Sequence, residues 1–201
     1  MENTSLLSEA SKRYLCCYYQ LLDEMAQTVM TARLTQGISH NFIVQAIPFH
    51  RAAAGMCRNF LEAGEGSKAV RGLAQASLDR LELVNADLEQ ALPVCARSAS
   101  PQRELRLYQR RTDLILRETA ARMGAAPEGG RLDAVFLGQL LPCHRGAVHM
   151  ARNALHYGAN PELTPILYTI IRHRCKELAQ IQGLRGRAAC QGGRLAIPAR
   201  F

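Results

Sequence analysis

The chain has no tryptophan, only three lysines and no hydrophobic run long enough to span a membrane. It also lacks a signal-peptide pattern, because the segment Met1–Lys12 is polar and has no basic start followed by an apolar stretch. We therefore expect a soluble, cytoplasmic protein without a membrane span. Its 201 residues are 48% hydrophobic and 21% charged, which predicts a folded chain rather than a disordered one.

The seven cysteines include no Cys-x-x-Cys pair, and their number is odd. A disulfide framework or a structural zinc site is therefore not expected, and we predict reduced thiols, most of them buried. Glu-x-x-His, Gly-x-Ser-x-Gly and phosphate-loop motifs are also absent. These absences give no support to a di-iron site, a serine hydrolase or an NTPase, and we expect the protein not to be an enzyme.

Basic residues exceed acidic ones by 25 to 17, and 22 of the basic residues are arginine. A GC-rich genome explains this excess, and the alternative is a surface that binds phosphate or carboxylate groups, since arginine binds both through a planar fork. The arginines are scattered and no tryptophan accompanies them, so specific nucleic-acid binding is not expected. Binding of acidic partners and formation of a homo-oligomer are both compatible with the sequence.

Segments 42–61 and 136–155 repeat one another at a constant offset of 94 residues, with ten identities in twenty positions. We interpret this as an internal duplication. Gly64 and Gly158 extend the repeat. The identical pairs are Phe42/Phe136, Gln45/Gln139, Pro48/Pro142, His50/His144, Arg51/Arg145, Ala53/Ala147, Met56/Met150, Arg58/Arg152, Asn59/Asn153 and Leu61/Leu155.

Apolar periodicity predicts three helices in each half, and no segment alternates as a strand would. The predicted helices cover residues 8–34, 41–62, 67–92, 101–123, 132–157 and 161–183. We predict an all-α fold of two tandem three-helix repeats related by a pseudo-twofold axis, in one cooperative domain. The predicted division is 1–92 for the first repeat, 93–101 for a linker, 102–183 for the second repeat and 184–201 for a basic tail.

Several residues predict helix ends. Ser100-Pro101 and Asn160-Pro161 are typical of helix starts, and a glycine such as Gly64 commonly closes a helix. In the last helix, apolar residues recur at spacings of three and four and predict a buried stripe. Its members are Leu163, Ile166, Leu167, Ile170, Ile171, Cys175, Leu178 and Ile181.

Two prolines, Pro48 and Pro142, lie inside the apolar pattern of the central helices. A proline inside a helix cannot donate to the carbonyl four residues back, so we expect a bend at each and unpaired carbonyls at Val44 and Gly138. The alternative to a functional kink is that each bend only wraps a long helix around the core.

Side chains that bind soft metals cluster in these repeated helices: His50 and Met56 in the first half, and Cys143, His144, His149 and Met150 in the second. Imidazole, thiolate and thioether groups suit copper and, less well, zinc. No single helix closes a site with these spacings, so a facing helix must contribute, and His173 and Glu177 are correctly spaced for this. The alternative is that the methionines are core residues and the histidines are hydrogen-bonded polar groups near the bends.

The repeated motif resembles the ferritin-like domain of unknown function 305 family. The matching residues are Phe42, Gln45, Pro48, His50, Ala53 and Met56, then Phe136, Gln139, Pro142, His144, Gly146, Ala147 and Met150, with Ile170 and Ile171 in the last helix. The resemblance implies a ferritin-like helical bundle and, in some relatives, copper binding through His and Met; most relatives have no established activity. The tandem form resembles bacterial proteins.

The chain departs from the family pattern at several positions. Phe49 and Cys143 stand where the family has the first histidine of its pair, and Arg174 stands where it has a glutamine. We therefore predict a non-catalytic helical bundle with a binding or structural role and degenerate metal-ligand motifs. The alternative is a copper- or zinc-binding protein that uses the Cys, His and Met cluster of the second repeat.

Overall fold

The computed structural model describes residues 7–126, 128 and 130–192, with side chains described up to residue 187. It is built from six helices: α1 (Glu9–Thr31), α2 (Ile38–Glu62), α3 (Lys68–Cys95), α4 (Gln102–Gly124), α5 (Leu132–His156) and α6 (Thr164–Gly192). No strand occurs within these described ranges. The prediction of an all-α fold is confirmed.

Five of the six helices begin and end within three residues of their predicted bounds. The exception is α6, which ends at Gly192, nine residues beyond the predicted end at residue 183. Residues 184–192, which we predicted to belong to a basic tail, therefore continue the helix. Gly183 and Gly186 weaken a helix without ending it, because leucine, arginine and alanine around them favour helix. The remainder of the predicted tail, 193–201, lies outside the described residues.

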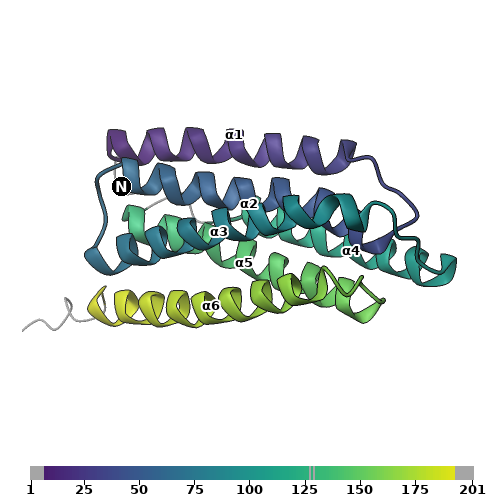
Figure 1. The fold of residues 1–201 in the computed structure, drawn as a ribbon. Coiled ribbons are helices and arrows are strands. Elements are labelled where there is room, and N and C mark those ends of the chain that lie inside the picture. Colours follow the sequence, from purple (N-terminus) through teal and green to yellow (C-terminus); the bar gives the residue numbers. More distant parts are fainter. Residues whose placement is uncertain (1–6, 127, 129, 193–201) are drawn as a thin grey trace, which may run out of the picture.

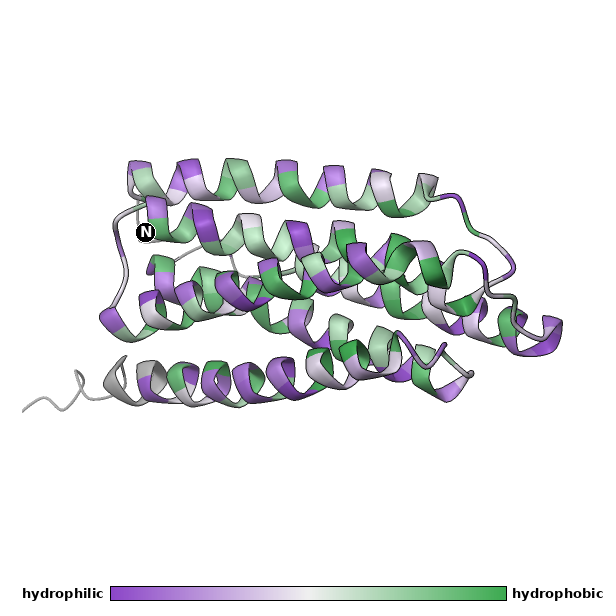
Figure 2. Ribbon diagram, in the orientation of Figure 1, coloured by the Kyte–Doolittle hydropathy of each residue, from purple (hydrophilic) through white to green (hydrophobic). Residues whose placement is uncertain are grey.

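The helices run side by side, with α1 at the top and α6 at the bottom of Figure 1. The central pair is α2 and α5, which contact each other; α2 also packs against α1 and α3, and α5 against α4 and α6. Hydrophilic and hydrophobic residues alternate around the helical turns (Figure 2), as in amphipathic helices. The buried hydrophobic residues of both halves form one continuous core.

Aromatic residues from three helices join the two halves. Phe60 of α2 stacks on Phe136 of α5 with ring centroids 4.2 Å apart. Tyr14 of α1 meets both rings edge-on at 6.5 and 6.4 Å, and its hydroxyl donates to Gln139 Oε1 at 2.7 Å. Because first-half residues pack directly on α5, separating the halves would expose large apolar surfaces of both.

Reciprocal hydrogen bonds connect the start of each central helix to a loop of the other half. Ser39 Oγ, at the start of α2, accepts from the Asn160 N–H at 2.7 Å, in the loop before α6. The equivalent residue of α5, Asp133, accepts from the Ser67 N–H at 3.0 and 3.1 Å, in the loop before α3. The two hydrogen bonds join equivalent positions of the sequence repeat, as the predicted pseudo-twofold arrangement would require.

The ends of both central helices follow the prediction. Gly64 and Gly158 have φ values of +73° and +85°, a conformation that favours glycine. Their N–H groups donate back to Leu61 O at 3.3 Å and Leu155 O at 3.4 Å, which satisfies carbonyls at the helix ends.

One predicted helix cap is wrong. Ser100 does not cap α4, whose N-cap is Pro101. The Ser100 Oγ instead accepts a hydrogen bond from the Ile38 N–H at 3.1 Å, at the start of α2. The tertiary fold brings the α3–α4 loop to the α2 N-terminus, where free N–H groups are available. A hydroxyl that is suited to one helix start is therefore used at another.

Pro48 and Pro142 lie inside α2 and α5, as predicted, and a third proline, Pro93, lies inside α3. The bends at the central prolines stay a prediction. Within the described part of the chain, no helix combines the length and apolarity that a membrane span requires.

The six described cysteines are free, and three of them are buried: Cys57, Cys95 and Cys143. This is fewer than the predicted majority, because Cys16 and Cys175 are exposed and Cys17 is half-buried. The seventh, Cys190, lies outside the described side chains.

Candidate functional site: a buried ion cluster

Five of the six predicted metal-ligand residues are buried: His50, Met56, Cys143, His144 and Met150. The sixth, His149, is exposed and lines a surface hollow between α4 and α5. The structure therefore separates His149 from the other three residues of the predicted second-repeat cluster. Among the described residues, no three His, Cys, Asp or Glu side chains are grouped so that they could hold a metal ion.

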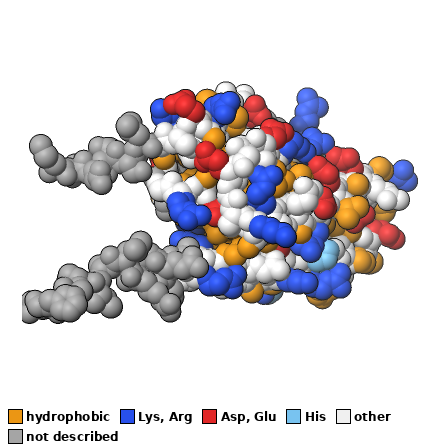
Figure 3. All heavy atoms as spheres, turned by 90° about the vertical axis from the view of Figure 1, so that its left-hand side faces the viewer, with side chains coloured by type: hydrophobic (Ala, Val, Ile, Leu, Met, Phe, Trp, Pro, Cys, Tyr) orange, Lys and Arg blue, Asp and Glu red, His pale blue; other side chains and the backbone are white. Residues whose placement is uncertain are grey.

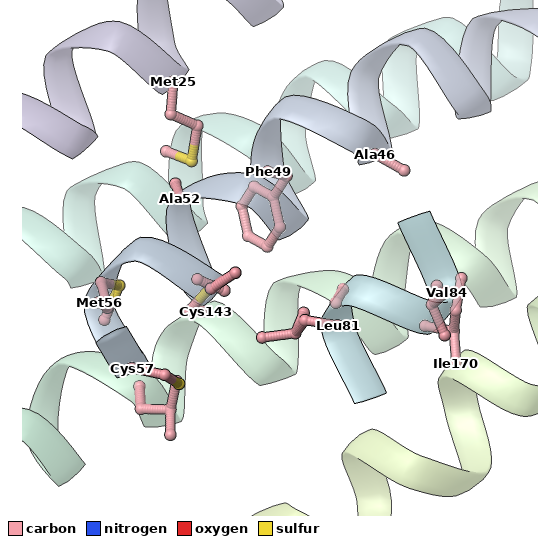
Figure 4. Packing of buried hydrophobic residues seen from close by; sticks show 14 of the residues in the cluster. Met25, Ala46, Phe49, Ala52, Met56, Cys57, Leu81, Val84, Cys143 and Ile170 are labelled. Atoms are coloured by element: carbon pink, nitrogen blue, oxygen red, sulfur yellow. The ribbon is translucent and has the colours of Figure 1, made fainter. Parts of the chain in front are cut away.

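Cys143 is part of the hydrophobic core. Figure 4 shows the buried residues around it, which include Phe49, Met56 and Cys57 of α2. Burial raises the pKa of the Cys143 thiol to about 12, with Arg174 acting in the opposite direction. Burial, with Cys143 second, also raises the pKa of Cys57. Both thiols are protonated at neutral pH, whereas a cysteine ligates a metal as the thiolate.

His144 faces two residues of α6. Its Nε2 lies 3.3 Å from Arg174 Nη1 and 3.1 Å from Glu177 Oε2. Arg174 Nη1 lies 2.7 Å from the same Glu177 oxygen. The exposed fractions of His144, Arg174 and Glu177 are 1%, 2% and 0%, so solvent does not reach these side chains. We call these three residues, with Arg80, the ion cluster.

Arg80 of α3 connects the ion cluster to the surface. Its Nη1 donates to Glu177 Oε1 at 3.0 Å, and its side chain is 31% exposed. Two atoms of the cluster, Glu177 Oε2 and Arg174 Nη2, have no well-aligned hydrogen bond within the described residues. The cluster is therefore held by charge attraction more than by ideal hydrogen-bond geometry.

The protonation states follow from burial and from these neighbours. Burial raises the pKa of the Glu177 carboxyl, but His144, Arg174 and Arg80 outweigh it and lower the pKa to about 2. Burial, followed by the charge of Arg174, lowers the pKa of His144, and Glu177 counteracts this only in part. Glu177 is therefore ionised and His144 neutral at neutral pH. Burial also lowers the pKa of the Arg174 guanidinium, and the charge of Glu177 opposes this.

His50, the first-repeat counterpart of His144, is also buried, but the position equivalent to Glu177 carries no carboxylate in the first repeat. Burial, followed by the nearby charge of Arg174, lowers the pKa of His50 to about 3, and protonation of His144 would act in the same direction. His50 Nδ1 and the buried Oδ1 of Asn85 both lack a well-aligned partner among the described residues. His50 is therefore a neutral, weakly bonded core histidine.

The outer helices explain this difference between the histidines. Buried positions of α3 recur in α6 at an offset of 93 residues, one less than in the central helices. The pairs are Val70/Leu163, Ala74/Leu167, Ser77/Ile170, Leu81/Arg174, Val84/Glu177 and Leu88/Ile181. The first repeat thus places leucine and valine where the second places an ion pair.

Sequence reasoning found part of this site. It named Glu177 as a residue that could reach His144, and the structure places the two 3.1 Å apart. His173, named with Glu177, is half-buried and its Nδ1 has no partner among the described residues. The predicted apolar stripe is wrong at Cys175, which is exposed, while Arg174 points inward.

The inward position of Arg174 had a signal in the sequence. The buried residues at 163, just before α6, and at 167, 170, 174, 177 and 181 within it follow strict spacings of three and four. Two charged residues occupy this series, and charge normally marks the solvent face. The spacing therefore correctly indicated that residues 174 and 177 are buried, although their charge suggested that they are exposed.

Fold and site together define an all-α bundle whose centre holds a closed ion cluster. Residues 107–185 match the family described as "Domain of unknown function (DUF305)". This match covers most of α4, all of α5 and most of α6, which is less than half of the chain, so similarity to the family is shown for the second repeat. Searches of curated proteins and of solved structures found no significant match.

Proposed function

We propose that this chain is a non-catalytic helical-bundle protein with a binding or structural role, in which a buried guanidinium has replaced a metal ion. The observation that carries the proposal is the position of Arg174, whose Nη1 lies 3.3 Å from His144 Nε2 and 2.7 Å from Glu177 Oε2. These are the two groups of the second repeat best suited to hold a metal, and the arginine contacts both.

A metal ion does not fit these residues. If His144 Nε2 is unprotonated, Arg174 donates to the lone pair that a metal would need; if Nε2 carries the proton, it donates to Glu177 Oε2 and offers a metal no lone pair. Arg174 also places a fixed positive charge beside Glu177, and a second cation at the same oxygen would be repelled. Metal binding would further require Cys143 to lose a proton against the cost of burial.

Burial of the cluster supports a non-catalytic role. A general acid, base or nucleophile must reach its substrate within hydrogen-bond distance. His144 and Glu177 are closed to solvent by the surrounding helices, and the most accessible member of the cluster, Arg80, is held on Glu177. The cluster is therefore better suited to fixing α3, α5 and α6 relative to one another.

The proposal extends family membership to the whole chain, with the first repeat as a degenerate copy of the second. Ten identities in twenty positions support this duplication, as do the reciprocal bonds of Ser39 and Asp133. A ferritin-like ancestry and a bacterial setting belong to the same proposal and rest on the resemblance.

Metal analysis tests the replacement of a metal by Arg174. We expect protein purified without a metal-affinity tag to contain no stoichiometric copper or zinc, and to bind none tightly in an anaerobic copper(I) titration against a competing chelator. Arg174→Gln, which introduces the residue found in the family pattern, frees the histidine lone pair and should gain copper binding.

The same titration distinguishes the alternative function. Stoichiometric copper binding by the wild type, weakened more by Cys143→Ser than by His50→Ala, would establish a soft-metal site in the second repeat and overturn the proposal. A folded Arg174→Gln protein that binds no copper would show that the arginine is not what excludes the metal.

A further inference from the structure

A hollow of about 310 Å³ lies between α4 and α5 on the surface of the second repeat. Its lining contains two arginines and two histidines but no carboxylate: Arg111, Ile115, His149, Arg152, Asn153 and His156. The floor is rigid because Asn153 Nδ2 donates to Tyr108 O at 3.0 Å and to Thr112 Oγ1 at 2.9 Å. The hollow thus combines a fixed floor with four basic side chains.

Arg152 of this hollow differs from its first-repeat counterpart in having no acidic partner. Arg58, equivalent to Arg152, pairs with Glu82 of α3 at 2.9 Å. The α6 position equivalent to Glu82, at the offset of 93, is Cys175. Neither Arg111 nor Arg152 forms an ion pair with a described residue.

The other basic residues of the hollow are also specific to the second repeat. At the offset of 94, Arg111, His149 and His156 correspond to Cys17, Gly55 and Glu62. Both halves therefore have an arginine at the position of Arg152, but only the second half has further basic residues around it. Such a gathering costs electrostatic free energy unless an anion binds there.

The charge of the whole chain is divided in the same way. Residues 1–100 carry nine Lys and Arg against ten Asp and Glu, whereas residues 101–192 carry fourteen against seven. In Figure 3 the lowest part of the view, where α6 lies, shows basic side chains, and the acidic ones gather higher and to the right. The second repeat thus gives an anion a favourable approach.

We infer that this hollow binds a phosphate group, either as inorganic phosphate or as a phosphomonoester. Guanidinium groups bind tetrahedral oxyanions through paired hydrogen bonds, and imidazole N–H groups add further donors. A doubly charged phosphate uses two arginines more fully than a singly charged carboxylate does. This inference goes beyond the proposed function and is independent of whether the ion cluster excludes a metal.

The test is a titration of the intact protein with inorganic phosphate and, separately, glycerol 3-phosphate, followed by NMR amide shifts and calorimetry. Sodium chloride at matched ionic strength is the reference. We expect saturable one-to-one binding, with shifts confined to α4 and α5. Tighter binding of glycerol 3-phosphate would identify a phosphomonoester ligand, and equal binding would identify free phosphate.

Matched variants separate a site from the effect of net charge. Arg111→Gln and Arg152→Gln should each weaken phosphate binding about tenfold, because each removes charged hydrogen bonds. Arg51→Gln and Arg58→Gln remove the same charge from the first repeat and should leave the affinity unchanged. Shifts that do not saturate, or equal losses in all four variants, would overturn the inference.

Discussion

The two halves have similar central helices, but those helices face different side chains. The third helix of the second half provides Arg174 and Glu177 beside His144, whereas the equivalent positions of the first half are Leu81 and Val84. The comparison shows how a buried histidine is accommodated in two ways. Burial and the nearby charge of Arg174 keep His50 neutral, whereas beside His144 the carboxylate of Glu177 partly opposes the same two effects.

The ionic setting makes the second half more sensitive to substitution. A buried ion pair stabilises a protein little more than well-packed apolar residues do, but a buried charge that has lost its partner is strongly destabilising. The equivalent positions of the first half are apolar, so no buried charge there requires a partner. Four predictions follow this contrast from the largest expected effect to the smallest.

Removing one charge of the cluster should have the largest effect. We expect Glu177→Val to lower the free energy of unfolding by about 3–5 kcal/mol, because Arg174 is left buried without its counter-ion. The double variant Arg174→Leu with Glu177→Val introduces the pair found in the first half and should recover most of this loss. Chemical denaturation measures both, and equal stabilities for the single variant and the wild type would contradict the contrast.

Acid should destabilise both halves through their histidines. The pKa of folded His50 is about 3, whereas that of an unfolded histidine is about 6.5, so the unfolded chain binds more protons between these values and stability falls as pH falls. We expect about 2 kcal/mol to be lost between pH 7 and pH 5 from His50 alone.

The same acid titration compares the two histidines. His50→Leu should flatten the pH profile more than His144→Leu, because Glu177 partly counteracts the lowering of the His144 pKa. A wild-type stability that does not change between pH 7 and pH 5 would show that neither histidine is held neutral by burial.

The reciprocal loop anchors should contribute less. We expect Asp133→Ala to cost about 1.5 kcal/mol and Ser39→Ala about 1 kcal/mol, because an ionised acceptor forms the stronger hydrogen bond. Thermal unfolding measures the difference, and Asp133→Asn, which keeps an acceptor oxygen, serves as the control. A larger cost for Ser39→Ala would mean that the two halves are not anchored equivalently.

The exposed ion pairs of the first half should matter least. Arg58 and Glu82 are both about half exposed, so water screens their attraction. We expect Glu82→Cys, which introduces the second-half residue, to cost about 0.5 kcal/mol in low salt and less in high salt. Denaturation at two salt concentrations provides the measurement.

The sequence was sufficient to predict the helices and most of their ends. The apolar spacing and the glycines after the central helices are local signals, and the structure follows them closely. The error at Ser100 shows the limit of local reasoning. A capping hydroxyl can serve any free helix N–H that the fold brings near it, and here that was Ile38 of another helix.

The candidate site was only partly predictable. Residue types indicated soft ligands, but whether His149 turns inward with Cys143 and His144 depends on how α5 is rotated against its neighbours. The third helices add a second uncertainty, because their one-residue change of offset decides that Arg174, rather than His173 or Cys175, enters the core.

By itself, the sequence determined most of the secondary structure, because helix formation depends on interactions among near neighbours in the chain, and it determined the residue types available for binding. Only the tertiary structure decided which side chains meet. Helix rotation changes by about 100° per residue, so a shift of one residue replaces the inward side chain entirely. That rotation placed the Arg174 guanidinium beside His144 in the second half and apolar residues at the equivalent positions of the first.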